Sequence, residues 1–314
     1  MAGTHCNLCY AVAQFLCLHE RKNPMGLWDT ILSFFSSDRL NINRRFDVMA
    51  EIHAGETGKV YKVREKKTGE ILALKVIWPK WQKSYQMRFD KLAAPSEPDI
   101  ALGLEHSNLV ETFEVGFTNA EEPYLLMEYC EGFNLDTLLK QRGDLDGKRI
   151  PLLRQMAEGL RAVHQKGYIH RDVCPENFVI SLALDRAKLL DFSLTVPNQS
   201  AYLVADPRSG RDAYMAPELM RPHETDQKID IYAFGVTAFQ LLTRRLPWDE
   251  DAGGTSIARA VRNATDIKKL RPKIQPQLAR AIHSCLLPRK AERCATMDEF
   301  LEQLQGLKHE DITS

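Results

Sequence analysis

Two kinds of hydrophobic pattern divide the chain. Residues 46–77 alternate between apolar and polar positions, with interruptions at Gly55 and Gly58, which predicts three antiparallel strands joined by turns. The alternation returns in residues 109–117 and 123–129, where we expect two more strands. The first part of the chain is therefore predicted to form a small antiparallel sheet.

Beyond Gly132 the apolar residues follow a helical period instead. They recur three or four positions apart, for example at Leu152, Met156, Leu160 and Val163. The sequence thus predicts an α+β fold with two lobes: a small antiparallel β-sheet lobe with one helix, and a larger, mainly helical lobe.

The change of pattern also gives the domain boundaries. We expect one domain over residues 46–305, with the small lobe at about 46–128, a joint at about 128–132 and the large lobe at about 133–305. Residues 1–45 form an accessory N-terminal segment and residues 306–314 a C-terminal tail. Ligands favour clefts at such joints between lobes.

The accessory segment has no feature of a membrane anchor. Its longest apolar run, residues 8–18, is shorter than the ~20 residues that a spanning helix needs, and no basic stretch precedes it as in a signal peptide. A zinc cluster could be formed by Cys6, Cys9, Cys17 and His19, although the single residue between the last two is an uncommon spacing.

The alternative for this segment is a short helix with an apolar stripe. A second stretch with helical spacing consists of Leu27, Ile31, Phe34 and Phe35. Such stripes would pack on the domain or on a partner, and self-association through the N-terminal segment is one hypothesis for their role.

Composition narrows the class of protein. The chain has 314 residues, 44% of them hydrophobic and 27% charged, which is enough apolar material for the large core of a soluble globular protein. Its 42 basic and 42 acidic residues cancel, so the net charge does not favour nucleic acid or an anionic membrane as a partner. Seven scattered cysteines, an odd number, favour a reducing cytoplasmic location.

Residues 52–60 combine a strand, a turn and a second strand, and are called the glycine loop below. Gly55 and Gly58 would let the backbone approach phosphate groups closely, and Val60 is placed to cover a flat apolar base. Glycine turns are common in hairpins, so this signal is weak by itself.

A lysine and three further side chains supply the candidate chemistry. Lys75 stands among apolar neighbours on the predicted third strand, where an unpaired ammonium would be costly, so we expect it to have anionic partners. Asp172, in His170-Arg171-Asp172, is a candidate base. Asn177, five residues later, and Asp191, in Leu190-Asp191-Phe192, offer oxygen ligands suited to Mg²⁺.

In this order and spacing, the motifs over residues 46–304 resemble those of the eukaryotic-type serine/threonine protein kinase family. Further matches are His106-Ser107-Asn108-Leu109-Val110, the hinge-like Met127-Glu128-Tyr129-Cys130, Ala216-Pro217-Glu218 and the stretch that begins Asp230-Ile231-Tyr232. The resemblance implies a two-lobed kinase fold. It also implies transfer of the γ-phosphate of ATP, with Mg²⁺, to a serine or threonine hydroxyl of a protein substrate.

The resemblance assigns roles to single residues. It implies that Lys75 contacts the α- and β-phosphates and pairs with Glu97, that Asp172 receives or orients the hydroxyl proton, and that Asn177 and Asp191 bind Mg²⁺. The implied ATP contacts are Ile52, His53, Ala54, Gly55, Glu56, Thr57, Gly58, Lys59, Val60, Ala73, Lys75, the gatekeeper Met127, Glu128, Cys130, Asn134 at the ribose, and Val179. Glu218 and Arg293 match a buried, structural ion pair.

Four residues depart from the family pattern. His53 replaces the first glycine of the glycine loop, and Ser193 replaces the glycine after Asp191-Phe192, where it resists positive φ angles. Beside the acceptor site, Cys174 stands in place of a lysine and Arg211 in place of a threonine.

A neutral thiol cannot supply the charge of the missing lysine, and we hypothesise that the guanidinium of Arg211 occupies the vacated space. The departures also leave an alternative open, a pseudokinase that acts as an ATP-binding or scaffolding module.

The helix that carries Glu97 is predicted to be short or irregular because Pro95 and Pro98 flank this residue. We expect the Lys75–Glu97 pair to form only when a partner or ATP orders the helix, with Asp99 as the nearest substitute.

Residues 191–218, called the activation segment below, contain several hydroxyl side chains: Thr195, Ser200, Tyr202, Ser209 and Tyr214. A phosphate on one of them could bind Arg171 beside Asp172. They could equally be ordinary loop hydroxyls, and both interpretations stay open.

Overall fold

The computed structural model describes the chain between residues 39 and 311 with several gaps. The described residues are 39–89, 92, 94–141, 144–202, 210–220, 225–248 and 263–311. The apolar stripes, the cysteine and histidine cluster and the self-association surface predicted for the N-terminal segment fall before residue 39, so they lie outside the described residues, as does Ser209.

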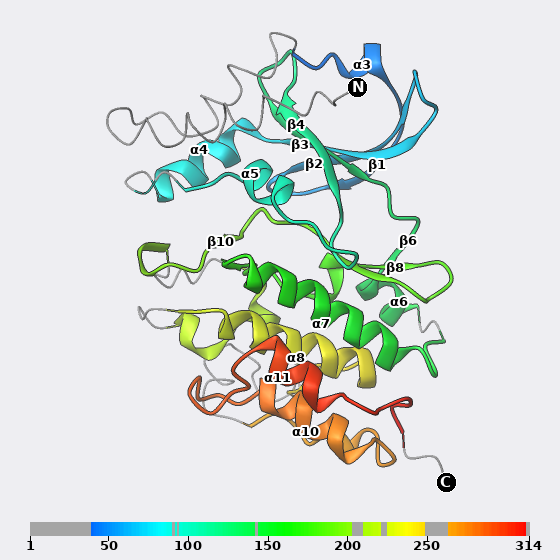
Figure 1. The fold of residues 1–314 in the computed structure, drawn as a ribbon, viewed down its shortest axis with the longest axis vertical. Coiled ribbons are helices and arrows are strands. Elements are labelled where there is room, and N and C mark those ends of the chain that lie inside the picture. Colours follow the sequence, from blue (N-terminus) through cyan, green and yellow to red (C-terminus); the bar gives the residue numbers. More distant parts are fainter. Residues whose placement is uncertain are drawn as a thin grey trace, which may run out of the picture. The chain divides into compact units, whose positions relative to one another are not determined.

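Five antiparallel strands form the sheet of the small lobe, in the order β1-β2-β3-β5-β4 (Figure 1). They are β1 (Phe46–Ala54), β2 (Gly58–Glu65), β3 (Ile71–Ile77), β4 (Thr112–Phe117) and β5 (Pro123–Glu128). The alternation of apolar residues predicted all five. A short helix, α3 (Ile42–Arg45), leads into β1. Strand β3 is the central strand of the sheet, between β2 and β5, and six of its seven residues are buried.

Two helices, where the sequence predicted one, connect β3 to β4. They are α4 (Pro79–Arg88) and α5 (Glu97–Leu102). Proline fits the first position of α4 because no helical hydrogen bond needs its missing N–H. Only Tyr85 of α4 is buried, so this helix lacks the apolar period that would have revealed it.

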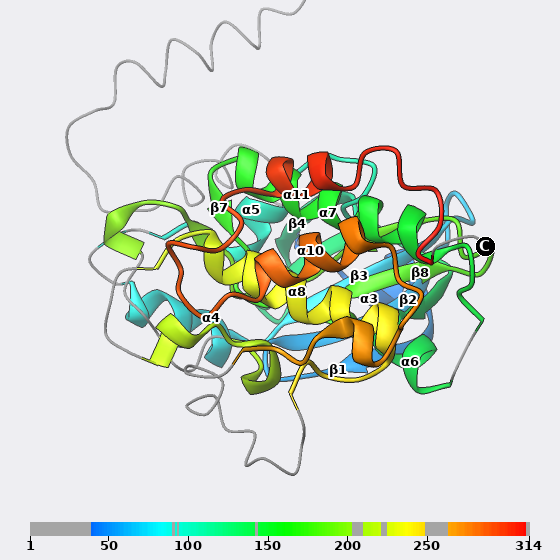
Figure 2. The same ribbon diagram turned by 90° about the horizontal axis from the view of Figure 1, so that it is seen from below.

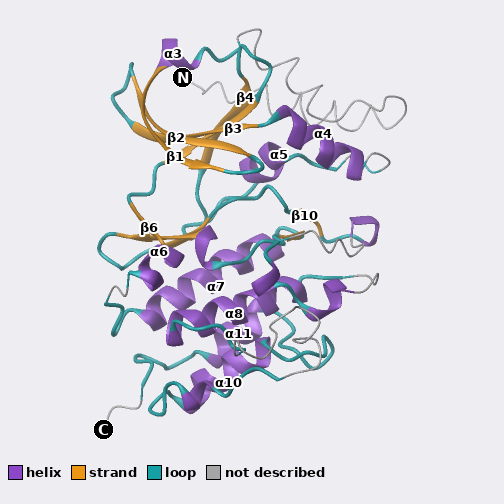
Figure 3. Ribbon diagram, turned by 180° about the vertical axis from the view of Figure 1, so that it is seen from behind, coloured by secondary structure: helices purple, strands orange, loops and turns teal. Residues whose placement is uncertain are grey.

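Helices make up most of the large lobe, and Figure 3 shows their separation from the strands of the small lobe. Among the described residues of this lobe, the α-helices are α6 (Leu135–Lys140), α7 (Arg149–Gln165), α8 (Lys228–Thr243), α10 (Pro276–Cys285) and α11 (Met297–Gln303). Short 3₁₀ turns cover Pro175–Asn177, Ser200–Tyr202, Asp212–Tyr214, Pro217–Met220 and Ile267–Lys269.

Two small sheets lie where the lobes join. One contains β6 (Gly132–Asn134), β8 (Phe178–Ser181) and β9 (Ala187–Leu189), and the other pairs β7 (Tyr168–Ile169) with β10 (Val196–Pro197). The joint predicted near residue 132 therefore leads directly into the first of these sheets.

The core of the large lobe surrounds α8. Thirteen of its sixteen residues are buried, and α8 and α10 lie side by side (Figure 2). The four periodic residues of α7 named above are all buried in this core, as predicted. Arg293 holds Glu218 through two hydrogen bonds of 2.6 and 3.0 Å, which confirms the predicted buried ion pair.

Residues beyond α11 also pack on the large lobe. Leu307 is buried, and Glu310 accepts a hydrogen bond of 2.8 Å from Arg149. Asp311 forms an ion pair with Arg271. Within the described ranges, the structure contains no helix that is long and apolar enough to cross a membrane.

Candidate active site

Lys75 lies between two carboxylates that come from different elements. Its Nζ atom is 2.5 Å from Oε1 of Glu97 on α5 and 2.8 Å from Oδ1 of Asp191, which follows β9. Lys75 is only 5% exposed, so each of these pairs is screened little by solvent. The buried lysine thus has the anionic partners that its apolar surroundings require.

The three charges shift one another's pKa values. Burial opposes the charged form of Lys75, but Asp191 and Glu97 outweigh it and hold its pKa above normal. Burial likewise opposes the charged form of Asp191, yet Lys75 and the bond from Ser193 hold its pKa well below normal. Burial raises the pKa of Glu97 to about 7, and the negative charge of Asp191 adds to this rise, against the opposing effect of Lys75.

Helix α5 begins at Glu97, and this start explains how Pro98 is accommodated. Pro98 falls in the first turn, where the missing N–H costs no helical hydrogen bond. Ser96 caps the helix and its N–H donates to Asp99 at 2.7 Å. The helix has six residues, short as predicted, but Asp99 serves the cap and does not replace Glu97, whose pair with Lys75 is already made.

The loop with Asp172 is fixed from below by Asp230 of α8. The carboxylate of Asp230 accepts hydrogen bonds from the backbone N–H groups of His170 and Arg171 at 2.7 and 2.8 Å, and it lies 2.9 Å from His164. Burial opposes the charged form of Asp230, but these bonds outweigh it and lower its pKa. Arg171 has a φ of +68°, so the hydrogen bonds to Asp230 hold a strained backbone in place.

Asn177 and Asp191 offer oxygens that fit a divalent cation. The amide nitrogen of Asn177 donates to the carbonyl and the carboxylate of Asp172 at 2.7 and 2.8 Å, which leaves its amide oxygen as a ligand. The side chain of Asp191 is 29% exposed and ionised. Since Mg²⁺ prefers oxygen ligands and needs few of them from the protein, these two residues fit the ion that the motifs imply.

The glycine loop closes on itself and on Trp78. The N–H of Gly55 donates to the Gly58 carbonyl at 3.0 Å. A Cβ at Gly58 would lie 2.1 Å from the Val76 carbonyl oxygen, so only glycine lets β2 approach β3 this closely. The ring of His53 stands where a side chain at Gly55 would be, so this histidine covers the loop that a glycine would leave open.

The other predicted nucleotide contacts lie on neighbouring strands, except Cys130, which lies between β5 and β6. Val60 opposes Lys75 across β2 and β3, Ala73 opposes Met127 across β3 and β5, and Asn134 opposes Val179 across β6 and β8. Two of them also have structural partners. The Asn134 side chain caps α6, and Glu128 binds Lys188. Cys130 is half-buried, and Ile52 is 47% exposed at the end of β1.

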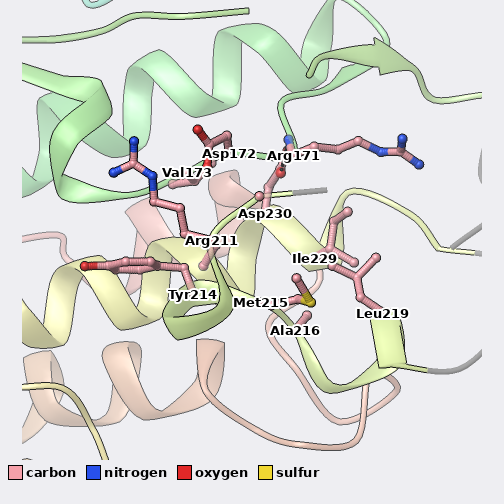
Figure 4. Close-up of a pocket in the computed structure, with 12 residues that line it drawn as sticks. Arg171, Asp172, Val173, Arg211, Tyr214, Met215, Ala216, Leu219, Ile229 and Asp230 are labelled. Carbon is pink, nitrogen blue, oxygen red and sulfur yellow. Dashed lines mark hydrogen bonds between the residues drawn. The ribbon is translucent and has the colours of Figure 1, made fainter. Parts of the chain in front are cut away.

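The two unusual residues beside Asp172 have different surroundings. Cys174 is fully buried, and burial raises the pKa of its thiol to about 12, so it carries no charge. Arg211 forms an ion pair with Glu176. In the pocket of Figure 4 the Arg211 side chain rises next to Asp172, whereas the guanidinium of Arg171 extends the other way.

The backbone conformation of Gly210 places Arg211 beside Asp172. It has a φ of +86°, and a Cβ there would lie 2.7 Å from the Arg171 carbonyl oxygen, so a glycine is needed where the activation segment crosses the Asp172 loop. The pocket below is lined by Tyr214, Met215, Ala216, Leu219 and Ile229 (Figure 4).

Sequence reasoning missed Trp78, Glu176 and Tyr85 as residues that contact the site. Trp78 donates from its indole nitrogen to the Gly55 carbonyl at 3.1 Å, and Tyr85 donates to the Thr195 carbonyl at 3.1 Å. Their partners are far away in the sequence, so no local spacing could have identified these contacts.

Comparisons with known proteins show which family the chain belongs to. A family described as "Protein kinase domain" matches residues 46–304. The chain is 33% identical over 253 residues to an "Aurora kinase" of Candida glabrata, which covers 76% of this chain and 68% of that protein. It is 26% identical over 274 residues to a "Probable serine/threonine-protein kinase" of Clostridium acetobutylicum (85% and 40%).

A third relative is the "Serine/threonine-protein kinase pkn2" of Myxococcus xanthus, 33% identical over 220 residues (68% of this chain and 26% of that protein). The chain therefore spans less than half the length of two of these three relatives.

Proposed function

The chain belongs to the protein kinase family, and on that premise we propose that it transfers the γ-phosphoryl group of ATP to a serine or threonine hydroxyl of another protein. The observation that carries the proposal is the arrangement of Lys75 between Glu97 and Asp191, across the junction of the lobes. Phosphoryl transfer depends mostly on positioning and charge stabilisation, which such a set of fixed charges can provide.

Each residue of the site has a role in this proposal. Mg·ATP, when bound, brings the transferable phosphoryl group and a divalent charge that neutralises it. Lys75 holds the α- and β-phosphates and is itself positioned by Glu97, while Asn177 and Asp191 hold the metal. The nucleotide is surrounded by the residues of the glycine loop and by six further residues: Ala73, Met127, Glu128, Cys130, Asn134 and Val179.

Asp172 receives or orients the proton of the acceptor hydroxyl. Burial raises the pKa of Asp172 above its usual range, against the opposing effects of His170, Arg211 and Asn177. A raised pKa makes this carboxylate a better proton acceptor than an exposed one. Asn177 donates one hydrogen bond to this carboxylate and one to the backbone carbonyl of Asp172, which together fix the orientation of the carboxylate.

Three finer points belong to the same proposal: Mg²⁺ as the metal, a protein as the acceptor, and a reducing cytoplasmic location. The location is supported by Cys130, Cys174, Cys285 and Cys294, which are free thiols among the described residues. Self-association through the N-terminal segment stays a prediction.

The experiment is ATP-to-protein phosphate transfer by the purified chain with Mg²⁺, on itself and on a generic basic protein. Asp172→Ala and Lys75→Ala are the controls, and transfer that vanishes in both supports the proposal. Absence of transfer by the parent chain, with ATP still raising its melting temperature, would favour a pseudokinase, which no contact among the described residues favours at present.

A further inference from the structure

Helix α4 and the residues at its ends contact two parts of the candidate active site, the glycine loop at the beginning of the helix and the activation segment at its end. Trp78, the residue before α4, donates from its backbone N–H to the Thr57 carbonyl at 2.9 Å and from its indole nitrogen to the Gly55 carbonyl at 3.1 Å. Two hydrogen bonds from one residue thus tie the glycine loop to the start of α4.

The end of α4 is tied to the activation segment by aromatic residues. Tyr85 donates to the Thr195 carbonyl at 3.1 Å, in a buried position. The ring of Phe89, just after α4, lies 5.2 Å from that of Tyr85 and 5.6 Å from that of Tyr202. Tyr202 in turn donates from its hydroxyl to the Leu92 carbonyl at 2.7 Å.

The same part of the activation segment is tied to the loop with Asp172. Arg171 donates to the Tyr202 carbonyl at 3.1 Å, and the Thr195 hydroxyl donates to the His170 carbonyl at 3.4 Å. A continuous set of contacts therefore runs from the glycine loop through α4 to the residues beside Asp172. Figure 3 shows α4 above β10 and the residues that follow it.

We propose that α4 is a strut that positions the glycine loop and the activation segment together, with Trp78, Tyr85 and Tyr202 as its positioning residues. All six hydrogen bonds are made by neutral groups or by backbone, apart from the bond from Arg171 to a carbonyl, so the strut holds the segment without a phosphate on it. Tyr202 is only 8% exposed, which makes it a poor acceptor for phosphorylation in this arrangement.

The expected changes in kcat and KM rest on the proposed function. The expected changes in hydrogen exchange of α4 and the activation segment do not. Loss of one net hydrogen bond corresponds to about fivefold in an equilibrium between ordered and displaced states. Tyr202→Phe and Tyr85→Phe are therefore expected to lower kcat about fivefold with little change in KM for ATP. Trp78→Phe is expected to raise KM for ATP by a similar factor.

The matched control is Tyr124→Phe. Tyr124 is also a buried tyrosine of the small lobe, but its hydroxyl donates to Glu114 of β4 at 2.5 Å and not to a residue of the activation segment or of α4. This variant should leave kcat and KM unchanged, which would separate the strut from a general effect of removing a buried tyrosine hydroxyl.

The test combines these kinetics with amide hydrogen exchange of peptides that cover residues 79–88 and 191–202. Tyr202→Phe should accelerate exchange in α4 as well as in the segment that carries the substitution. Unchanged exchange in α4, or a wild-type kcat in Tyr202→Phe, would overturn the strut. If the parent chain transfers no phosphate, the exchange data still decide the strut while the proposed function fails. Should Tyr85→Phe not fold, Tyr202→Phe alone decides, because it removes a different hydroxyl of the same set of contacts.

Discussion

Replacing Arg211 with alanine separates the role of its charge in catalysis from any role in stability. The side chain of Arg211 is 37% exposed and pairs with Glu176, which is 43% exposed. Exposed pairs of this kind contribute less than about 1 kcal/mol to folding because solvent screens them. Arg211→Ala should therefore unfold at nearly the same temperature as the parent.

The expected effect on phosphate transfer is larger. Two unit charges at a separation on the order of 6 Å, in a region with an effective dielectric constant near 20, interact by about 3 kcal/mol. Because Arg211 is partly exposed, we reduce this to about 1.4 kcal/mol, which corresponds to about a tenfold fall in kcat. Cys174 cannot compensate, since it is buried and uncharged.

The assay is steady-state transfer to a protein acceptor at saturating ATP, with two further variants beside Arg211→Ala. Arg211→Lys keeps the positive charge and should lose less than about threefold, whereas Glu176→Gln removes the ion pair but keeps the cation. The pH profile gives a second reading. Arg211 lowers the pKa of Asp172, so its removal should move the acid limb of kcat to higher pH. An Arg211→Ala variant as active as the parent would refute the reasoning.

Three further predictions concern the charges around the site. Lys75→Met should abolish transfer and leave Glu97 buried without a cation. Because the pKa of Glu97 in the folded protein is raised, stability is lost as pH rises, so the melting temperature of this variant should fall more than that of the parent between about pH 5 and about pH 8. Asp230→Asn should lower kcat and remove part of the acid unfolding seen below about pH 4, because the folded pKa of Asp230 is depressed and the stability it contributes is lost as pH falls. Glu218→Gln leaves the fully buried guanidinium of Arg293 without its anion and should lower the free energy of unfolding in urea by about 3 kcal/mol, without an effect on KM for ATP.

Sequence patterns predicted the elements whose signal is local. Alternation located the five strands of the small lobe, and the spacing of four apolar residues located α7, because burial of one face imposes a period. The motif residues Lys75, Asp172 and Asn177 were identified by their order and spacing along the chain, and their roles stay predictions. The pair between Glu218 and Arg293 came from resemblance to a family.

The features that sequence did not reveal depend on contacts between distant segments. Helix α4 buries only Tyr85, so its residues resemble those of an exposed loop. Pro98 would break a helix in its interior but not in its first turn. The reciprocal hydrogen bonds of Ser96 and Asp99 cap α5 at Ser96, which places Pro98 in the first turn. The ion pair of Arg211 with Glu176 joins residues whose proximity follows only from the path of the activation segment around Gly210.

That path has a consequence for how activity is controlled. A lysine in the position of Cys174 would belong to the same rigid loop as Asp172, which Asp230 holds in place. Here the nearby cation belongs instead to the activation segment, and its distance from the acceptor depends on where that segment lies. Displacement of the segment would then remove the charge of Arg211 together with the contacts of Tyr202. The effects of Arg211→Ala and Tyr202→Phe on kcat should for this reason be less than additive, because a segment that has moved no longer presents its arginine.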